Sequence, residues 1–115
     1  MRVSRRVLTI LPGDSYEEVA RWLQNFVTSH AKRESPRVEG VVETPGEREG
    51  RSYGVRLRLG DRFLPPPAEP PVELAYPEVA DGRAKFVWCE TFATRVRRWA
   101  RELLDAEAGR SFRSA

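Results

Sequence analysis

The sequence predicts a single α+β domain, in which a mostly antiparallel sheet of four to five strands carries two helices on one face. The length of 115 residues corresponds to one domain with a small core. The composition, with 40% hydrophobic residues and three Trp, is typical of a globular protein. The apolar patterns follow the order β-α-β-β-(β)-β-α, which favours a two-layer arrangement with both helices on the same side of the sheet.

The first two predicted elements are a strand at residues 3–11 and a helix at residues 15–31, joined by a proline-glycine turn. Ser15 and Glu18 have the S-x-x-E spacing of a capping box, and apolar residues then recur at helical spacing. Phosphate often binds at a junction of this kind. Here the turn has one glycine and no lysine, and carboxylates in the first helical turn would repel an anion. We therefore interpret the junction as structural.

Residues 37–43 and 53–59 are predicted to pair as a hairpin across the polar loop TPGEREGRS. Apolar and polar residues alternate in the second segment, which indicates a strand with one buried face. Arg56 and Arg58 therefore point to the open face of the sheet. Cross-strand pairing with glutamates should neutralise them there. The residues of the first strand that share this face are Glu39, Val41 and Glu43.

A proline-rich segment follows, with six prolines in residues 63–77. We predict an extended connection that contains a short strand at residues 72–76. A P-x-x-P sequence, Pro67 to Pro70, lies within it, and such sequences can dock in aromatic grooves. A stiff connection across the sheet edge is the better interpretation.

The C-terminal third of the chain predicts a strand and a helix. Residues 84–89 carry apolar side chains at positions that face both sides of a strand, so this strand should be central. Glu90 or Thr91 caps a helix that reaches Ala108, and Gly109 is a natural stop.

The predicted domain therefore covers residues 1–109, and residues 110–115 form a C-terminal tail. The periodicities of the helices and strands point toward one shared core. Its predicted members are Tyr16, Val19, Leu23, Phe26, Val55, Leu57, Phe86, Phe92, Val96, Trp99 and Leu103.

The charge of the chain is basic, with a formal net charge of +3 and a pI of about 9.5. Arginine accounts for 18 of the 20 basic residues, a bias typical of a GC-rich genome and compatible with a thermophilic source. Residues 82–115 carry a net charge of +4, so the basic charge is concentrated at the C-terminal end.

Several classes of function have no support in the sequence. One Cys and one His cannot form a multi-ligand metal site or an internal disulfide, and no cofactor motif is present. The apolar run at residues 7–11 follows three arginines but is shorter than the roughly 7–15 residues of a secretion signal. No run approaches membrane-spanning length. We therefore expect a cytoplasmic protein.

The second helix is the strongest candidate for binding nucleic acid, because four arginines surround its apolar stripe. These are Arg95, Arg97, Arg98 and Arg101. The competing interpretation is a solvated helix face, in which Arg98 pairs with Glu102 and Arg101 with Asp105, each four residues further on.

Residues 50–59, GRSYGVRLRL, resemble the third strand of the RNA-recognition motif, and the β-α-β-β order also matches. That family buries the positions that Gly54, Arg56 and Arg58 occupy here, so the chain does not fit it. A small enzyme using Cys89 as nucleophile, with His30 as its partner, is a third class. Glu90 beside the thiol and the apolar run around it favour a buried structural cysteine.

The predicted function is that of a non-enzymatic interaction domain, which self-associates or docks to a protein partner. Two helices cover only one face of a sheet, so the central strand would leave apolar side chains exposed on the other. The predicted interface comprises Val41, Val87 and Cys89, and a homodimer is one of its two expected forms. Nucleic-acid binding by the second helix is the alternative.

Overall fold

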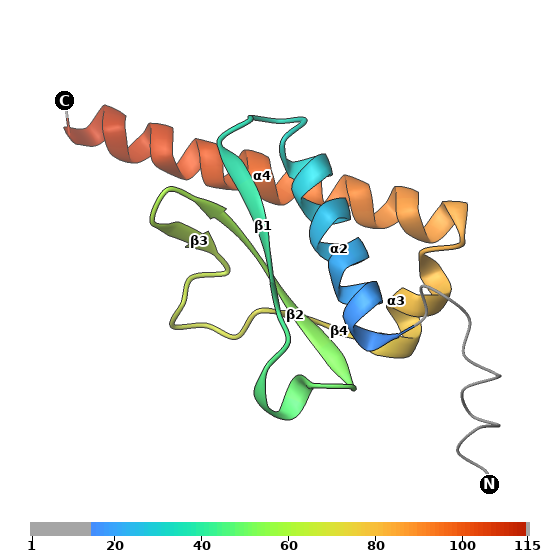
Figure 1. The fold of residues 1–115 in the computed structure, drawn as a ribbon. Coiled ribbons are helices and arrows are strands. Elements are labelled where there is room, and N and C mark those ends of the chain that lie inside the picture. Colours follow the sequence, from blue (N-terminus) through green and yellow to red (C-terminus); the bar gives the residue numbers. More distant parts are fainter. Residues whose placement is uncertain (1–14, 115) are drawn as a thin grey trace, which may run out of the picture.

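The computed structural model describes the backbone of residues 15–114 and the side chains of residues 15–109, and it has the predicted α+β architecture (Figure 1). The predicted strand at residues 3–11 lies outside this part. An antiparallel sheet carries α2 and α4 on one face, and α3 closes one end. The elements in chain order are α2 (Tyr16–Ala31), β1 (Val38–Glu43), η1 (Gly46–Arg48), β2 (Ser52–Leu59), β3 (Arg62–Leu64), β4 (Val72–Ala75), α3 (Tyr76–Gly82) and α4 (Phe86–Ser114).

Helix α2 begins where the capping box predicts it. Oγ of Ser15 accepts a hydrogen bond from the backbone N–H of Glu18, with 3.1 Å between the heavy atoms. This bond satisfies one of the backbone donors that every helix start leaves without an internal partner. One stripe of the helix is buried against the sheet, as the helical spacing predicts. It consists of Val19, Leu23, Val27 and Ala31.

The central strand of the sheet is β2. It pairs antiparallel with β1 on one side and with both β3 and β4 on the other. The predicted alternation is confirmed, since its apolar side chains are buried in the core with the helices: Tyr53, Val55, Leu57 and Leu59. On the open face, Nη2 of Arg58 lies 2.6 Å from Oε1 of Glu39, the residue directly across from it. The predicted cross-strand ion pairing is therefore present.

The proline-rich connection crosses the open face of the sheet over Arg56. Nε of Arg56 lies 2.9 Å from Oε2 of Glu43. Its Nη1 donates hydrogen bonds to the carbonyl oxygens of Pro65 and Pro66, at 3.0 and 2.8 Å. Arg56 is consequently only 9% exposed. The connection thus covers part of this face, which the sequence did not indicate.

Helix α2 closes the outer edge of β1. The side-chain amide of Gln24 donates to the carbonyl of Gly40 at 2.6 Å and accepts from the N–H of Val42 at 3.0 Å. Oγ1 of Thr28 accepts from the N–H of Gly40 at 3.0 Å. The backbones also approach closely, since a Cβ at Gly40 would lie 2.6 Å from Cγ1 of Val27. A free strand edge can pair with other chains, and these contacts occupy it.

The predicted central strand at residues 84–89 is wrong, because helix α4 begins at Phe86. The run FVWC is apolar at every position, and buried strands share this pattern with buried helices. In a helix, Trp88 lies on the same side as Phe92 and Val96, which follow it by one and two turns. The three residues therefore form one apolar stripe toward the core. The Trp88 ring then packs on Gly82, where a Cβ would lie 2.5 Å from Cδ2 of the indole.

Other element boundaries also differ from those predicted. Helix α3 begins at the last residue of the strand predicted at residues 72–76, and its proline lies in the first helical turn, where the missing N–H does no harm. The short strand β3 was not predicted. Helix α4 continues through Gly109 to Ser114, so the predicted stop at Ala108 is wrong and the backbone of residues 110–114 is helical.

The core fills the space between the sheet and helices α2 and α4. Of the residues predicted to form it, Phe86 is the exception, because its side chain is 76% exposed. The others are buried in the core or pack against it: Tyr16, Val19, Leu23, Phe26, Val55, Leu57, Phe92, Val96, Trp99 and Leu103.

We expect Gly40→Ala to destabilise the domain by about 1–3 kcal/mol, because the added methyl group collides with Val27 at the closest contact of helix and sheet. Gly109→Ala is the matched control, since apart from its chain neighbours and the nearby backbone of its own helix no atom lies within 4 Å of its Cβ position. Alanine there should raise the free energy of unfolding by about 0.5–1 kcal/mol through helix propensity. Denaturant unfolding measures the free energy of unfolding of both variants. Equal changes in the two variants would contradict the close approach of Val27 to Gly40.

Candidate interaction surface at the start of helix α4

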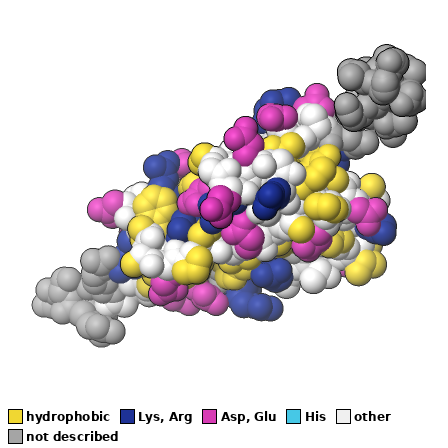
Figure 2. All heavy atoms as spheres, turned by 90° about the horizontal axis from the view of Figure 1, so that it is seen from below, with side chains coloured by type: hydrophobic (Ala, Val, Ile, Leu, Met, Phe, Trp, Pro, Cys, Tyr) yellow, Lys and Arg dark blue, Asp and Glu magenta, His cyan; other side chains and the backbone are white. Residues whose placement is uncertain are grey.

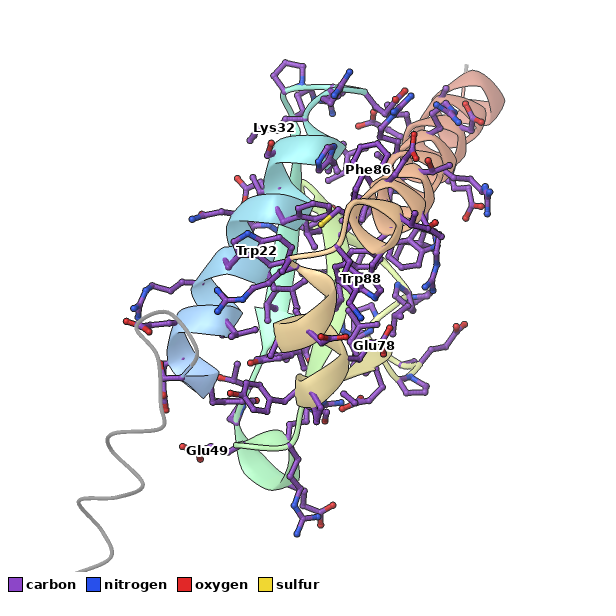
Figure 3. All side chains as sticks on the ribbon, turned by 90° about the vertical axis from the view of Figure 1, so that its right-hand side faces the viewer. Trp22, Lys32, Glu49, Glu78, Phe86 and Trp88 are labelled. Atoms are coloured by element: carbon purple, nitrogen blue, oxygen red, sulfur yellow. The ribbon has the colours of Figure 1, made fainter. Side chains whose placement is uncertain are left out.

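The first turn of α4 exposes two large apolar side chains. Phe86 is 76% and Val87 is 72% exposed, and within residues 15–109 these are the large hydrophobic side chains that lie open to solvent. Trp88 turns inward, because residues two apart on a helix lie about 200° apart around its axis. Figure 3 shows Phe86 toward the end of α2 near Lys32, and Trp88 lower, beside α3.

A hollow of about 340 Å³ lies beside Phe86, between the C-terminal half of α2 and the start of α4. We call it the α2–α4 hollow. Its lining combines apolar groups with charges of both signs. The lining residues are Phe26, His30 and Arg33 from α2 and the turn after it, and Phe86, Cys89, Glu90, Ala93, Thr94 and Arg97 from α4.

The wall of the α2–α4 hollow is held by aromatic packing. The ring of Phe26 stacks on Trp22 and on Phe92, with centroids 4.8 and 5.8 Å apart. The ring of Trp88 lies 5.2 Å from that of Phe92, and the ring of His30 lies 4.5 Å from that of Phe26. Aromatic pairs at these separations add to the stability of a core. The hollow is therefore shaped by two packed helices.

The structure brings His30 and Cys89 to the same hollow, as a cysteine enzyme would require. Burial, together with the positive charges of Arg33 and Arg97, lowers the pKa of His30. Burial raises the pKa of the Cys89 thiol, whose Sγ lies 3.6 Å from the carbonyl oxygen of Gly82. Both shifts favour the neutral forms. A reactive pair needs a thiolate beside a charged imidazole, so the local electrostatics oppose this chemistry.

One polar atom at the hollow lacks a partner. Nδ1 of His30 is buried and makes no hydrogen bond within the described part of the chain. A buried polar atom without a hydrogen bond costs free energy.

The arginines proposed to bind nucleic acid are largely engaged by other groups of the domain. Nε of Arg97 and Nη1 of Arg101 lie 3.3 and 3.2 Å from the two carboxylate oxygens of Glu34, in the turn after α2. Arg95 lies over two aromatic rings of its own helix, 5.0 Å from the nearer centroid. Arg98 is exposed. The partner of Arg101 is thus a carboxylate outside α4, and not the one predicted within it.

The predicted interface residues do not share one surface. Val41 lies on β1 and points to the open face of the sheet, whereas Val87 and Cys89 lie on α4, which packs against the other face. The prediction depended on a strand at residues 84–89, and that strand is absent from the fold. Only Val87 and Cys89 lie near the α2–α4 hollow. The lining from Phe26, His30 and Arg33 was missed, because the sequence does not show which helix faces meet.

A second hollow, of about 540 Å³, lies at the hairpin loop around η1. Nε of Arg48 lies 3.0 Å from Oε2 of Glu73, and its Nη1 lies 3.9 Å from Oε1 of Glu43. The hydroxyl of Ser52 donates to the same carboxylate of Glu73 at 2.5 Å. These charges already satisfy one another, so this hollow makes a poor binding site.

No three His, Cys, Asp or Glu side chains of the described residues lie together as metal ligands. In the same part of the chain, no helix is both long and apolar enough to cross a membrane. No model of a known protein family, no curated protein and no solved structure matches this chain.

We expect the imidazole of His30 to titrate below its usual pKa of 6.5. The folded state then resists a proton that the unfolded state accepts, so stability should fall as the pH drops below about 6.5 and level off below the folded pKa. The chain has one histidine, so its ring protons in an NMR titration give the value directly. A midpoint at or above 6.5 would show that the ring is solvated.

We expect the thiol of Cys89 to react slowly with a soluble alkylating reagent in the folded protein and rapidly after unfolding. Partial burial limits the access of the reagent, and the raised pKa reduces the thiolate fraction on which the reaction depends. The chain has one cysteine, so mass spectrometry follows the reaction without ambiguity. Rapid labelling of the folded protein at neutral pH would reopen the enzyme interpretation.

Proposed function

We propose that this domain is a non-enzymatic protein-interaction module, which binds its partner at the α2–α4 hollow and the adjoining Phe86 and Val87. The observation that carries the proposal is the exposure of these two side chains, 76% and 72%, directly beside a hollow with an apolar wall. Grouped apolar side chains on a protein surface mark interaction sites. An aromatic anchor inside a charged rim is also the usual anatomy of an interface.

The energetics support an interface of modest strength. Complete burial of one large apolar side chain contributes about 1.5–3 kcal/mol, so Phe86 and Val87 supply the main favourable term. Aromatic packing within the domain already fixes the wall of the hollow. Binding therefore needs little additional ordering of these side chains, which lowers its free-energy cost.

Nucleic-acid binding through α4 is the alternative function. Arg97 and Arg101 share the carboxylate of Glu34, and Arg95 lies on aromatic rings, which leaves Arg98 as the most available charge of the four. The face shown in Figure 2, on the side away from α4, mixes Lys and Arg side chains with acidic and apolar ones, so it offers no continuous basic area that would extend the one on α4. Nucleic acid favours such an area.

The test uses a displayed library of random twelve-residue peptides and the full chain as bait. Peptides that bind should share an apolar side chain, and Phe86→Asp should reduce their binding at least about tenfold, because it places a charge in the apolar contact. Ala68→Asp is the matched control. It makes the same type of change at an exposed position of the proline-rich connection, and it should leave binding unchanged.

The same proteins are then titrated with fluorescently labelled duplex and single-stranded DNA at low salt. We expect no binding that depends on Arg98. A different result would be DNA binding that weakens steeply with salt and is abolished by Arg98→Glu. If Phe86→Asp then affects the binding of neither DNA nor peptides, the nucleic-acid function replaces the one proposed.

A further inference from the structure

We infer that the partner at the α2–α4 hollow is a second copy of this chain, related by a two-fold axis, with Phe86 of each copy inserted into the hollow of the other. The inference rests on the proposed function and adds the identity of the partner. It comes from the chemistry of the surface, which carries both a projecting side chain and a hollow beside it.

A two-fold interface requires one surface to carry both halves of each contact, because residue i of one copy meets residue j of the other and the reverse. The α4 side of the hollow supplies the projection, Phe86 (Figure 3). The α2 side supplies the receiving groups, Phe26 and His30. If the axis runs along the groove between the helices, the α4 side of each copy faces the α2 side of the other. Both projections are then buried at once.

The charges of the rim have the same self-complementary arrangement. Arg33 belongs to the α2 side of the hollow and Glu90 to the α4 side. Neither forms an ion pair within residues 15–109. The two-fold rotation exchanges the two sides, so the side of one copy that carries Arg33 faces the side of the other that carries Glu90, and this happens twice. A surface of one charge sign would repel its own copy, whereas this one attracts it.

The N-terminal segment of the same chain is a less suitable occupant. It contains apolar residues, but Arg2, Arg5 and Arg6 precede them. Those arginines would add positive charge close to Arg33 and Arg97, which line the hollow. A second copy instead brings one glutamate for each arginine at position 33.

The surface is small, so the dimer should be weak. Stable interfaces bury about 1,600 Å² in total, and weak ones less than about 1,200 Å². The contact described consists of one projecting turn, one hollow and one ion pair in each direction of the rotation. We therefore expect monomer and dimer to exchange at protein concentrations of about 10 µM to 1 mM.

The first experiment is sedimentation equilibrium of the full chain across that range. The average mass should rise toward that of the dimer for the wild-type protein and for the control Ala68→Asp. It should stay that of the monomer for Phe86→Asp. Phe86 is exposed, so the variant should keep its fold, which circular dichroism verifies.

The second experiment exchanges the charges. Arg33→Glu gives two acidic groups at the rim, and Glu90→Arg gives two basic groups, so each variant alone should self-associate about tenfold more weakly. An equimolar mixture of the two variants should associate at least as well as the wild type, because every new charge then meets an opposite one. A foreign partner or the N-terminal segment would not produce this recovery.

The inference is overturned if the wild-type chain stays monomeric at 1 mM, or if the mixture associates no better than its components. If peptides of the displayed library nevertheless bind in a manner that depends on Phe86, the hollow serves a different protein and the proposed function survives. If those peptides do not bind either, both proposals fail.

Discussion

The contact of helix α2 with the edge of β1 determines most of what the domain presents to solvent. The amide of Gln24 and the hydroxyl of Thr28 occupy the backbone groups that β1 leaves unpaired, and Val27 rests on Gly40. Only glycine allows this separation. These contacts fix the position of α2 along β1 and its rotation about its own axis. Because the sheet side of α2 is fixed, its other side, with Phe26, is turned toward α4, where the aromatic packing begins.

The exposure of Phe86 follows from the packing of its neighbour. Trp88 lies on Gly82 at the end of α3 and contacts Phe92 of its own helix. With Trp88 turned inward, the geometry of a helix places Phe86 on the opposite side of the same turn. Rotating the turn to bury Phe86 would expose a larger indole. The first turn of α4 therefore presents an apolar group to solvent as a result of building the core.

Features that depend on neighbouring residues in the sequence were predictable, and features that depend on which helix faces meet were not. The cap of Ser15 and the alternation of β2 are local, as is the pairing of Arg58 with Glu39 across one hairpin. The run FVWC has no polar residue to reveal its period, so its helical state is decided by the contact of Trp88 with Gly82. The α2–α4 hollow combines residues more than fifty positions apart, and no spacing in the sequence links them.

The arginine beneath the proline-rich connection has a consequence for how freely that segment can vary. Arg56 binds the connection by two main-chain carbonyl oxygens, and every amino acid offers that group. These two hydrogen bonds therefore do not depend on which side chains the connection carries. Prolines keep the path stiff, while Ala68 and Glu69 at its outer bend are exposed. The N–H of Glu69 donates to the Pro66 carbonyl at 2.9 Å and closes the bend, so a fluorescent label on the side chain at position 68 would keep both this turn and the arginine anchor, whereas an inserted epitope would disturb them.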